Sequence, residues 1–103
     1  YAWFDKNSGG KTQPVRQKKP NQWGLHDVHG NVWEWCQDWK GDYPKGPVAD
    51  PTGPKEGQDR VLRGGSWNYS GEYCRSAFRY VFHPSYRLQY FGFRVVLVPR
   101  SVP

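Results

Sequence analysis

Two carboxylates, Asp27 and Glu34, lie at the ends of the stretch "DVHGNVWE" and could bind a cation together. Calcium in proteins takes about six to eight oxygen ligands, which are mostly carboxylates and backbone carbonyls. Asp27 and Glu34, with the carbonyls of Gly30 and Val32 between them, would supply part of such a shell. The alternative, which the spacing alone favours, is that Glu34 pairs with a buried arginine and Asp27 caps a turn.

The remaining reactive side chains form no arrangement that is typical of catalysis. His26 and His29 flank Asp27, but no third partner is fixed by spacing, so we interpret both as turn residues. The two cysteines, Cys36 and Cys74, are too few for a zinc site. They could form one disulfide or serve as two small buried hydrophobic residues.

The composition predicts how such residues can be positioned. A chain of 103 residues suits one domain, and 12 Gly with 9 Pro indicate many turns and little helix. Aromatic residues make up 17% of the chain although all hydrophobic residues together reach only 36%, so the core must consist of few, large side chains. Trp67 and Phe93 are the expected core residues. No apolar run is long enough to span a membrane.

Short strands and long loops are the predicted elements. We expect a short strand at "YAWF", a polar arm up to residue 20, a buried strand or turn around residues 32–36, and a long loop over residues 41–59. A strand in "RVLRGGSW" is expected to end at a double glycine, which indicates a bulge or a close backbone approach. The strongest strand signal is "FGFRVVLV", residues 91–98.

The formal net charge is +6, and a basic chain can attract nucleic acid. Much of this charge comes from residues 16–20, and the arginines of the second half stand singly among aromatic residues instead of forming a stripe. We therefore interpret the charge as a solvated loop together with paired arginines, and nucleic acid is not an expected partner.

Residues 67–91 hold a dense set of aromatic side chains without the period of a strand or a helix. One reading is that these side chains form the core. The other is that they form a binding surface, because Tyr combines a large contact area with a low entropy cost and a hydroxyl group. The lack of a period favours the binding surface.

Four motifs, "GLHDVHGNVWEW", "RVLRGGSW", "CRSAFR" and "GFRVV", resemble the formylglycine-generating enzyme family, also called the sulfatase-modifying-factor domain. The resemblance extends from Tyr1 to about Val98 and implies one domain over residues 1–103. It implies an α+β, C-type-lectin-like fold with short antiparallel strands, long loops and little regular secondary structure. Family domains usually have more sequence upstream, so we expect a short version or a C-terminal portion.

The resemblance has opposite implications for two metal sites. It implies calcium ligands at Asp27, at the Gly30 and Val32 carbonyls, and at Glu34, which makes calcium a candidate cofactor. The family's copper-binding cysteine pair does not carry over, because Cys74 lies downstream of both catalytic positions in our alignment. We therefore expect neither copper nor enzymatic activity, and the alternative is a divergent metal-dependent oxidase or oxygenase of the same superfamily.

Residues 67–91 also resemble the variable region of proteins diversified by retroelements, in which adenines of a template copy are randomised. Such a region implies a hypervariable ligand-binding surface, here with a protein as the expected ligand. Most of the candidate residues are reachable from AAC codons, whereas Gln89 would need a Lys-type codon. The candidates are Asn68, Tyr69, Ser70, Gly71, Tyr73, Phe78, Tyr80, Val81, Phe82, His83, Tyr86, Leu88, Gln89 and Tyr90.

Overall fold

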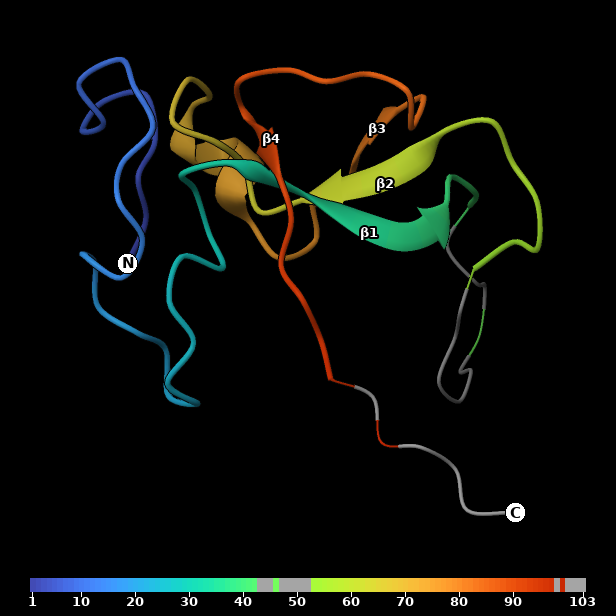
Figure 1. Cartoon of the computed structure of the whole chain (residues 1–103), viewed down its shortest axis with the longest axis horizontal. Coiled ribbons are helices and arrows are strands. Elements are labelled where there is room, and N and C mark those ends of the chain that lie inside the picture. Colours follow the sequence, from blue (N-terminus) through green and yellow to red (C-terminus); the bar gives the residue numbers. More distant parts are fainter. Residues whose placement is uncertain (43–45, 47–52, 98, 100–103) are drawn as a thin grey trace.

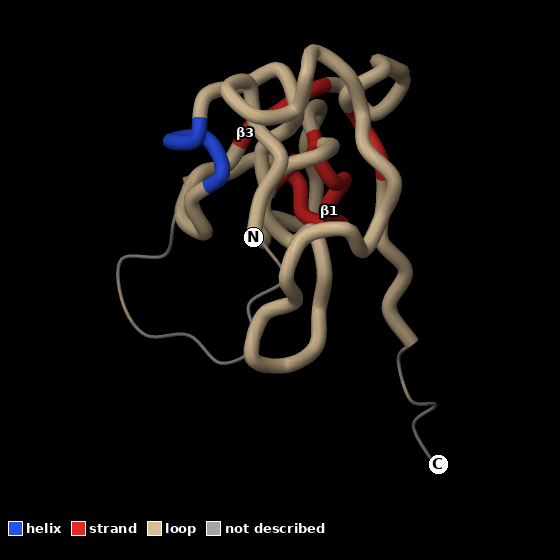
Figure 2. Tube along the Cα trace, turned by 90° about the vertical axis from the view of Figure 1, so that its left-hand side faces the viewer, coloured by secondary structure: helices blue, strands red, loops and turns tan. Residues whose placement is uncertain are grey.

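The computed structural model describes residues 1–42, 46, 53–97 and 99, and within them one small sheet organises the chain. Its strands are β1 (Trp33–Trp39), β2 (Arg60–Arg63), β3 (Tyr80–Phe82) and β4 (Phe91–Gly92), in the order β3-β2-β1-β4 (Figure 1). The helical part of the described chain is a single 3-10 turn, η1 (Gly71–Cys74). Loops make up most of the remaining trace (Figure 2).

The sheet is antiparallel except at one edge. β1 pairs with β2 and β2 with β3 in antiparallel fashion, as predicted, but β4 runs parallel to β1. Because alternate side chains of a strand point to opposite faces, the register places Trp33, Leu62 and Tyr80 on one face. Glu34 and Val81 lie on the other face.

The core is small and centres on β1 and β2. Trp33 and Leu62 are fully buried and Val61 is nearly so. The expectation for Phe93 is wrong, since this side chain is 79% exposed, and Trp67 is only half-buried. The core is thus built on a tryptophan, as the composition indicates, but this residue is Trp33 of β1 and not Trp67.

The predicted strand over residues 91–98 is also largely wrong. β4 pairs with β1 only at Trp33–Phe91 and Glu34–Gly92, and residues 93–97 have no strand partner in the described part of the chain. Without a partner, the alternating apolar pattern cannot bury a face, so Val95, Val96 and Leu97 are exposed. Residue 98 lies outside the described residues.

The N-terminal segment is tied to the rest of the chain. In place of the expected strand, "YAWF" contributes one isolated bridge between Trp3 and Gly30. Further along, the backbone N–H of Asp5 donates to the Tyr69 carbonyl at 2.9 Å, and Ser8 Oγ donates to the Trp67 carbonyl at 2.7 Å. The segment therefore supports the start of the aromatic-rich stretch.

Two further expectations concern the long loop over residues 41–59 and the lack of a membrane-spanning segment. Of the predicted loop over residues 41–59, positions 43–45 and 47–52 lie outside the described residues, and the positions that are described up to 59 belong to no helix or strand. The described part of the chain contains no helix with the length and hydropathy needed to cross a bilayer.

Candidate ligand-binding surface and its supporting turn

The aromatic side chains that follow the double glycine pack on one buried residue, Trp33. The ring of Tyr80 stacks on Trp33 with centroids 5.1 Å apart and an interplanar angle of 20°. Tyr69 meets the same indole edge-on at 5.4 Å, and Phe78 lies tilted at 6.0 Å. Offset and edge-on pairs of this kind stabilise beyond the area they bury, by about 0.5–1.5 kcal/mol each. Trp33 is therefore the floor of a layer of rings.

Further rings extend this layer outward. Phe82 contacts Tyr80 at 5.3 Å and Tyr86 at 5.2 Å, while Tyr90 contacts Tyr69 at 5.8 Å. Seven of the sequence-predicted binding residues thus join in one continuous group of ring contacts. We call this group the aromatic cluster: Tyr69, Tyr73, Phe78, Tyr80, Phe82, Tyr86 and Tyr90.

No member of the aromatic cluster is buried: six are half-buried, and Tyr86 is 52% exposed. A closed core would hide these rings, and an unpacked loop would expose them all. Partial exposure over a buried indole leaves ring surface and hydroxyl groups open to a partner.

The other predicted binding residues are divided by the fold. Val81 pairs with Val61 in the sheet, so its side chain points to the face opposite the cluster. The rest are half-buried or exposed and lie in η1 or on the loops that flank the cluster residues: Asn68, Ser70, Gly71, His83, Leu88 and Gln89. Sequence reasoning missed Trp33 as the supporting residue and Trp35, which meets Phe91 edge-on at 5.3 Å.

Hydroxyl groups also meet inside the cluster. Tyr69 Oη donates to Tyr80 Oη at 3.3 Å. Burial is the main cause that raises the pKa of Tyr69 above its usual value of 10.0, and this hydrogen bond raises it further. The phenol is therefore a neutral donor near neutral pH and not a source of negative charge on the surface.

The backbone that carries the cluster is fixed from outside it. The Trp67 N–H donates to the Asn31 carbonyl at 2.8 Å, and the Trp33 N–H donates to the Tyr90 carbonyl at 2.8 Å. These bonds involve main-chain atoms at both ends of the stretch. A change of side chain between them leaves the bonds in place.

The double glycine confirms the predicted close backbone approach. Gly64 and Gly65 have φ values of 101° and 75°, in the left-handed region that favours glycine. A Cβ at Gly65 would lie 2.6 Å from Cys74 Sγ, and one at Gly64 would lie 3.0 Å from the Val28 carbonyl. The motif therefore lets β2 end against η1.

Residues 26–31, which we call the anchor turn, hold three segments together through Asn31. Its backbone N–H donates to the Trp3 carbonyl at 2.8 Å. Its side chain accepts from the Gln13 N–H at 2.9 Å and donates to the Gln13 carbonyl at 3.0 Å. Asn31 is buried with φ of 69°, which Asn tolerates better than most residues. From the sequence alone, only the two histidines of this segment are interpreted as turn residues.

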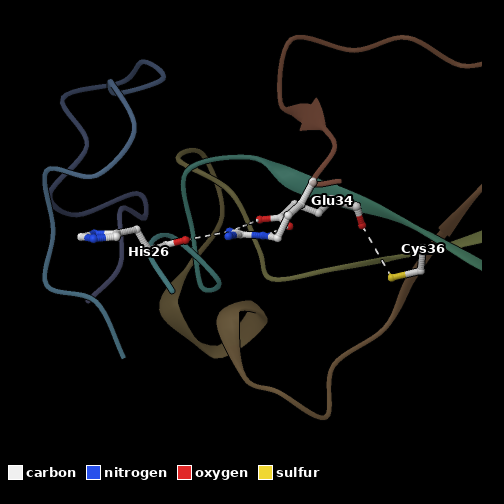
Figure 3. A network of polar contacts seen from close by, with 4 residues as sticks. His26, Glu34 and Cys36 are labelled. Atoms are coloured by element: carbon white, nitrogen blue, oxygen red, sulfur yellow. Dashed lines mark hydrogen bonds and ion pairs between the residues drawn. The ribbon is translucent and has the colours of Figure 1, made fainter. Parts of the chain in front are cut away.

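The four candidate calcium ligands line one cavity of about 360 Å³ together with Arg94. Glu34 already has a partner there: Arg94 Nε and Nη2 donate to its two carboxylate oxygens at 2.8 and 3.1 Å. The same guanidinium donates to the His26 carbonyl at 2.7 Å (Figure 3). The hydrogen bond to Glu34 raises the pKa of Arg94. The pairing alternative therefore describes Glu34, although Arg94 is only partly buried.

Asp27 is more open to a cation than Glu34. Its Oδ2 accepts a hydrogen bond from the Arg16 N–H at 2.9 Å and so caps the turn that contains Arg16. Its Oδ1 is buried without a hydrogen-bond partner. A buried carboxylate oxygen without a donor is costly, so a ligand at this atom would be stabilising. Within the described ranges, no three His, Cys, Asp or Glu side chains are grouped so that they could hold a metal ion.

The histidines and cysteines have structural partners. The Nδ1 atoms of His26 and His29 hydrogen-bond to the carbonyls of Lys18 and Cys74, as suits turn residues. Cys36 and Cys74 are free thiols, so the alternative of two separate cysteines holds in the structure. Burial raises the pKa of both thiols, which disfavours the reactive thiolate.

This chain matches one protein family and is similar to enzymes of the same kind. The model of the sulfatase-modifying factor enzyme 1-like domain matches residues 1–98. The formylglycine-generating enzyme of Streptomyces coelicolor is 49% identical over 65 residues, which are 61% of this chain and 21% of that enzyme. The enzyme of the same name from Thermomonospora curvata is 41% identical over 96 residues, covering 85% of this chain and 32% of that one.

Solved structures of similar proteins agree with the fold. Variable protein 1 of Treponema denticola superimposes with a TM-score of 0.85 at 48% identity, covering 90% of this chain and 34% of its own. PvdO of Pseudomonas aeruginosa gives a TM-score of 0.77 at 31% identity, covering 90% and 37%. The fold is thus the formylglycine-generating-enzyme type of C-type-lectin-like fold, and the chain spans between 21% and 37% of the length of these relatives.

Proposed function

Because this chain belongs to the family of sulfatase-modifying factor enzyme 1-like domains, we propose that it is a family member that binds a ligand without catalysis. The binding surface is the aromatic cluster with its exposed neighbours. A retroelement diversifies residues 67–91. The ligand is a protein. One observation carries the proposal: seven partly exposed rings form one group, of which three pack on buried Trp33, on a backbone whose ends are hydrogen-bonded elsewhere.

This arrangement suits a surface that must change while the fold persists. The bonds at Trp67 and Tyr90 use main-chain atoms, so they are independent of the side chains between. Tyr and Phe are effective contact residues, and single anchors in protein interfaces contribute about 2 kcal/mol or more when truncated. The similarity to variable protein 1 of Treponema denticola supports a variable binding module over an enzyme.

The cysteines support a non-catalytic role. Both are partly or fully buried with raised pKa values, Cys36 in β1 and Cys74 in η1. The family relatives include enzymes, so a divergent metal-dependent oxidase is the alternative. Elemental analysis of the purified chain decides between the two: copper or iron at one equivalent would favour the oxidase.

A library test addresses the binding surface. The candidate residues between 68 and 90 that do not pack on Trp33 are replaced with NNC codons, and the displayed variants are sorted for resistance to protease. We expect a large share of variants to stay folded, because the anchoring bonds are to the main chain. In a matched library at residues 26–31, few variants should survive. Equal survival in the two libraries would contradict the proposal.

Diversification by a retroelement has its own test in the gene. We expect a near-identical repeat of the segment that encodes residues 67–91, with adenines at the positions that differ, beside a reverse transcriptase gene. Sequencing the locus checks this, and substitutions spread over all four template bases would speak against it.

Calcium at Asp27, Gly30, Val32 and Glu34 is a further part of the proposal. The four residues line one cavity and Asp27 Oδ1 lacks a donor, but the ion competes with Arg94 for Glu34. When bound, it would supply positive charge to the turn and no redox chemistry. We expect millimolar calcium, but not magnesium, to raise the melting temperature, and Asp27→Ala to abolish this rise. An unchanged melting temperature would count against the ion.

A further inference from the structure

Among the arginines of the second half that the structure describes, one differs from the others. Arg60, Arg63, Arg75, Arg79 and Arg94 each donate a hydrogen bond to a carbonyl or carboxylate of the chain. Arg87 belongs to the arginines that the sequence analysis interprets as paired, but it is exposed and makes no hydrogen bond or ion pair with any described residue. A scaffold role therefore does not explain it.

The position of Arg87 relates it to the proposed binding surface. It follows Tyr86, the most exposed ring of the aromatic cluster, whose ring contacts Phe82 at 5.2 Å. Two turns fix the loop around it, because the Tyr86 N–H donates to the His83 carbonyl at 3.1 Å and the Phe91 N–H to the Leu88 carbonyl at 3.0 Å. Arg87 thus projects from an ordered loop at the edge of the cluster.

The charged side chains of this stretch of the sequence have one sign. Between residues 73 and 97 the sequence contains four arginines and no Asp or Glu, and the whole chain carries a net charge of +6. A guanidinium binds a carboxylate through two parallel hydrogen bonds, and arginine is enriched among residues that dominate interfaces. The tyrosine hydroxyl groups of the cluster can act as additional hydrogen-bond donors.

From these observations we infer that Arg87 is a carboxylate-binding residue of the surface and that the protein ligand presents an Asp or Glu side chain to it. This inference rests on the proposed function, since it names the chemistry of the partner at the same surface. Rings would bury the apolar part of the ligand, and Arg87 would orient it through its acidic group.

A display selection with random linear peptides tests the inference, with the folded chain as bait. We expect the selected peptides to be enriched in Asp and Glu over the unselected library. Arg87→Ala should weaken their binding about tenfold or more, the loss typical of one charged hydrogen-bonded partner. Arg87→Lys, which keeps the charge without the planar fork, should weaken it less. Lys11→Ala, which removes an exposed charge from the N-terminal segment, is the control and should have little effect.

The outcomes separate this inference from the proposed function. Peptides that lose affinity on Tyr86→Ser but not on Arg87→Ala would overturn the acidic partner and leave the binding surface intact. Peptides insensitive to substitutions in the aromatic cluster, or a selection without any binder, would overturn both. Since Arg87 has no partner in the described chain, Arg87→Ala should unfold at the temperature of the unsubstituted chain, which a thermal scan checks.

Discussion

The anchor turn and the aromatic cluster are held in different ways. Asn31 in the anchor turn bonds the Trp3 carbonyl through its backbone N–H, and its side chain both accepts from and donates to the Gln13 main chain. The cluster is held by ring contacts such as Tyr80 on Trp33, which many apolar or aromatic side chains could make in altered form. Hydrogen bonds fix geometry more strictly than ring contacts, so the anchor turn specifies the fold while the cluster remains free to vary.

The largest expected effect comes from Gly30 in the anchor turn. A Cβ there would overlap the backbone carbonyl of Trp3 and lie 2.7 Å from its nitrogen, at φ of 81°. We expect Gly30→Ala to lower the free energy of unfolding by about 4 kcal/mol, from backbone strain and overpacking together. Urea unfolding measures it.

Gly24 provides a matched control for this change. It has the same φ of 81°, but nothing lies within 4 Å of the position that a Cβ would take there. Gly24→Ala should therefore show the strain alone, about 1 kcal/mol. Equal losses at Gly24 and Gly30 would mean that the contact with Trp3 is not a constraint on the fold.

The next largest effect is expected at Asn31. Asn31→Ala removes two hydrogen bonds to the Gln13 main chain and leaves a non-Gly residue at φ of 69°. We expect a loss of about 3 kcal/mol, because partly buried main-chain groups of Gln13 become unsatisfied and Ala is strained at this φ. Asn31→Asp keeps the acceptor and should lose less, as thermal or urea unfolding can show. A loss below about 1 kcal/mol for Asn31→Ala would weaken the contrast between the two regions.

Asn31 also shows why sequence reasoning succeeded in one region and failed in the other. The double glycine and the aperiodic rings are local signals, and they predicted the close approach after β2 and an aromatic set that is not buried. The role of Asn31 depends on Trp3 and Gln13, which are distant in sequence and carry no motif that points to it. Phe93 failed similarly, because its burial requires a strand partner that β4 lacks beyond Gly92 in the described chain.

A smaller effect is expected from the Glu34–Arg94 pair. Arg94 is joined to the anchor turn through the His26 carbonyl, but the pair is partly exposed. The side chains of Arg94 and Glu34 are 35% and 19% accessible to solvent. A double-mutant cycle with Glu34→Ala and Arg94→Ala should give a coupling of about 1 kcal/mol, reduced in high salt. A coupling of zero would assign the stabilising role of Arg94 to its bond with the His26 carbonyl alone.

The smallest effect should come from the outer part of the cluster. Tyr86 is 52% exposed and its ring contacts only Phe82 among the described rings, so Tyr86→Ser should change the free energy of unfolding by less than about 0.5 kcal/mol. Tyr80→Ser is the informative partner, because it uncovers the stacked indole of Trp33 and should lose about 2 kcal/mol. If both substitutions were equally costly, the whole cluster would be part of the hydrophobic core. The distinction between an anchor turn that specifies the fold and a surface that can vary would then fail. If only Tyr80 is costly, variation is confined to the rings that do not touch Trp33, and these are the positions at which ligands would be distinguished.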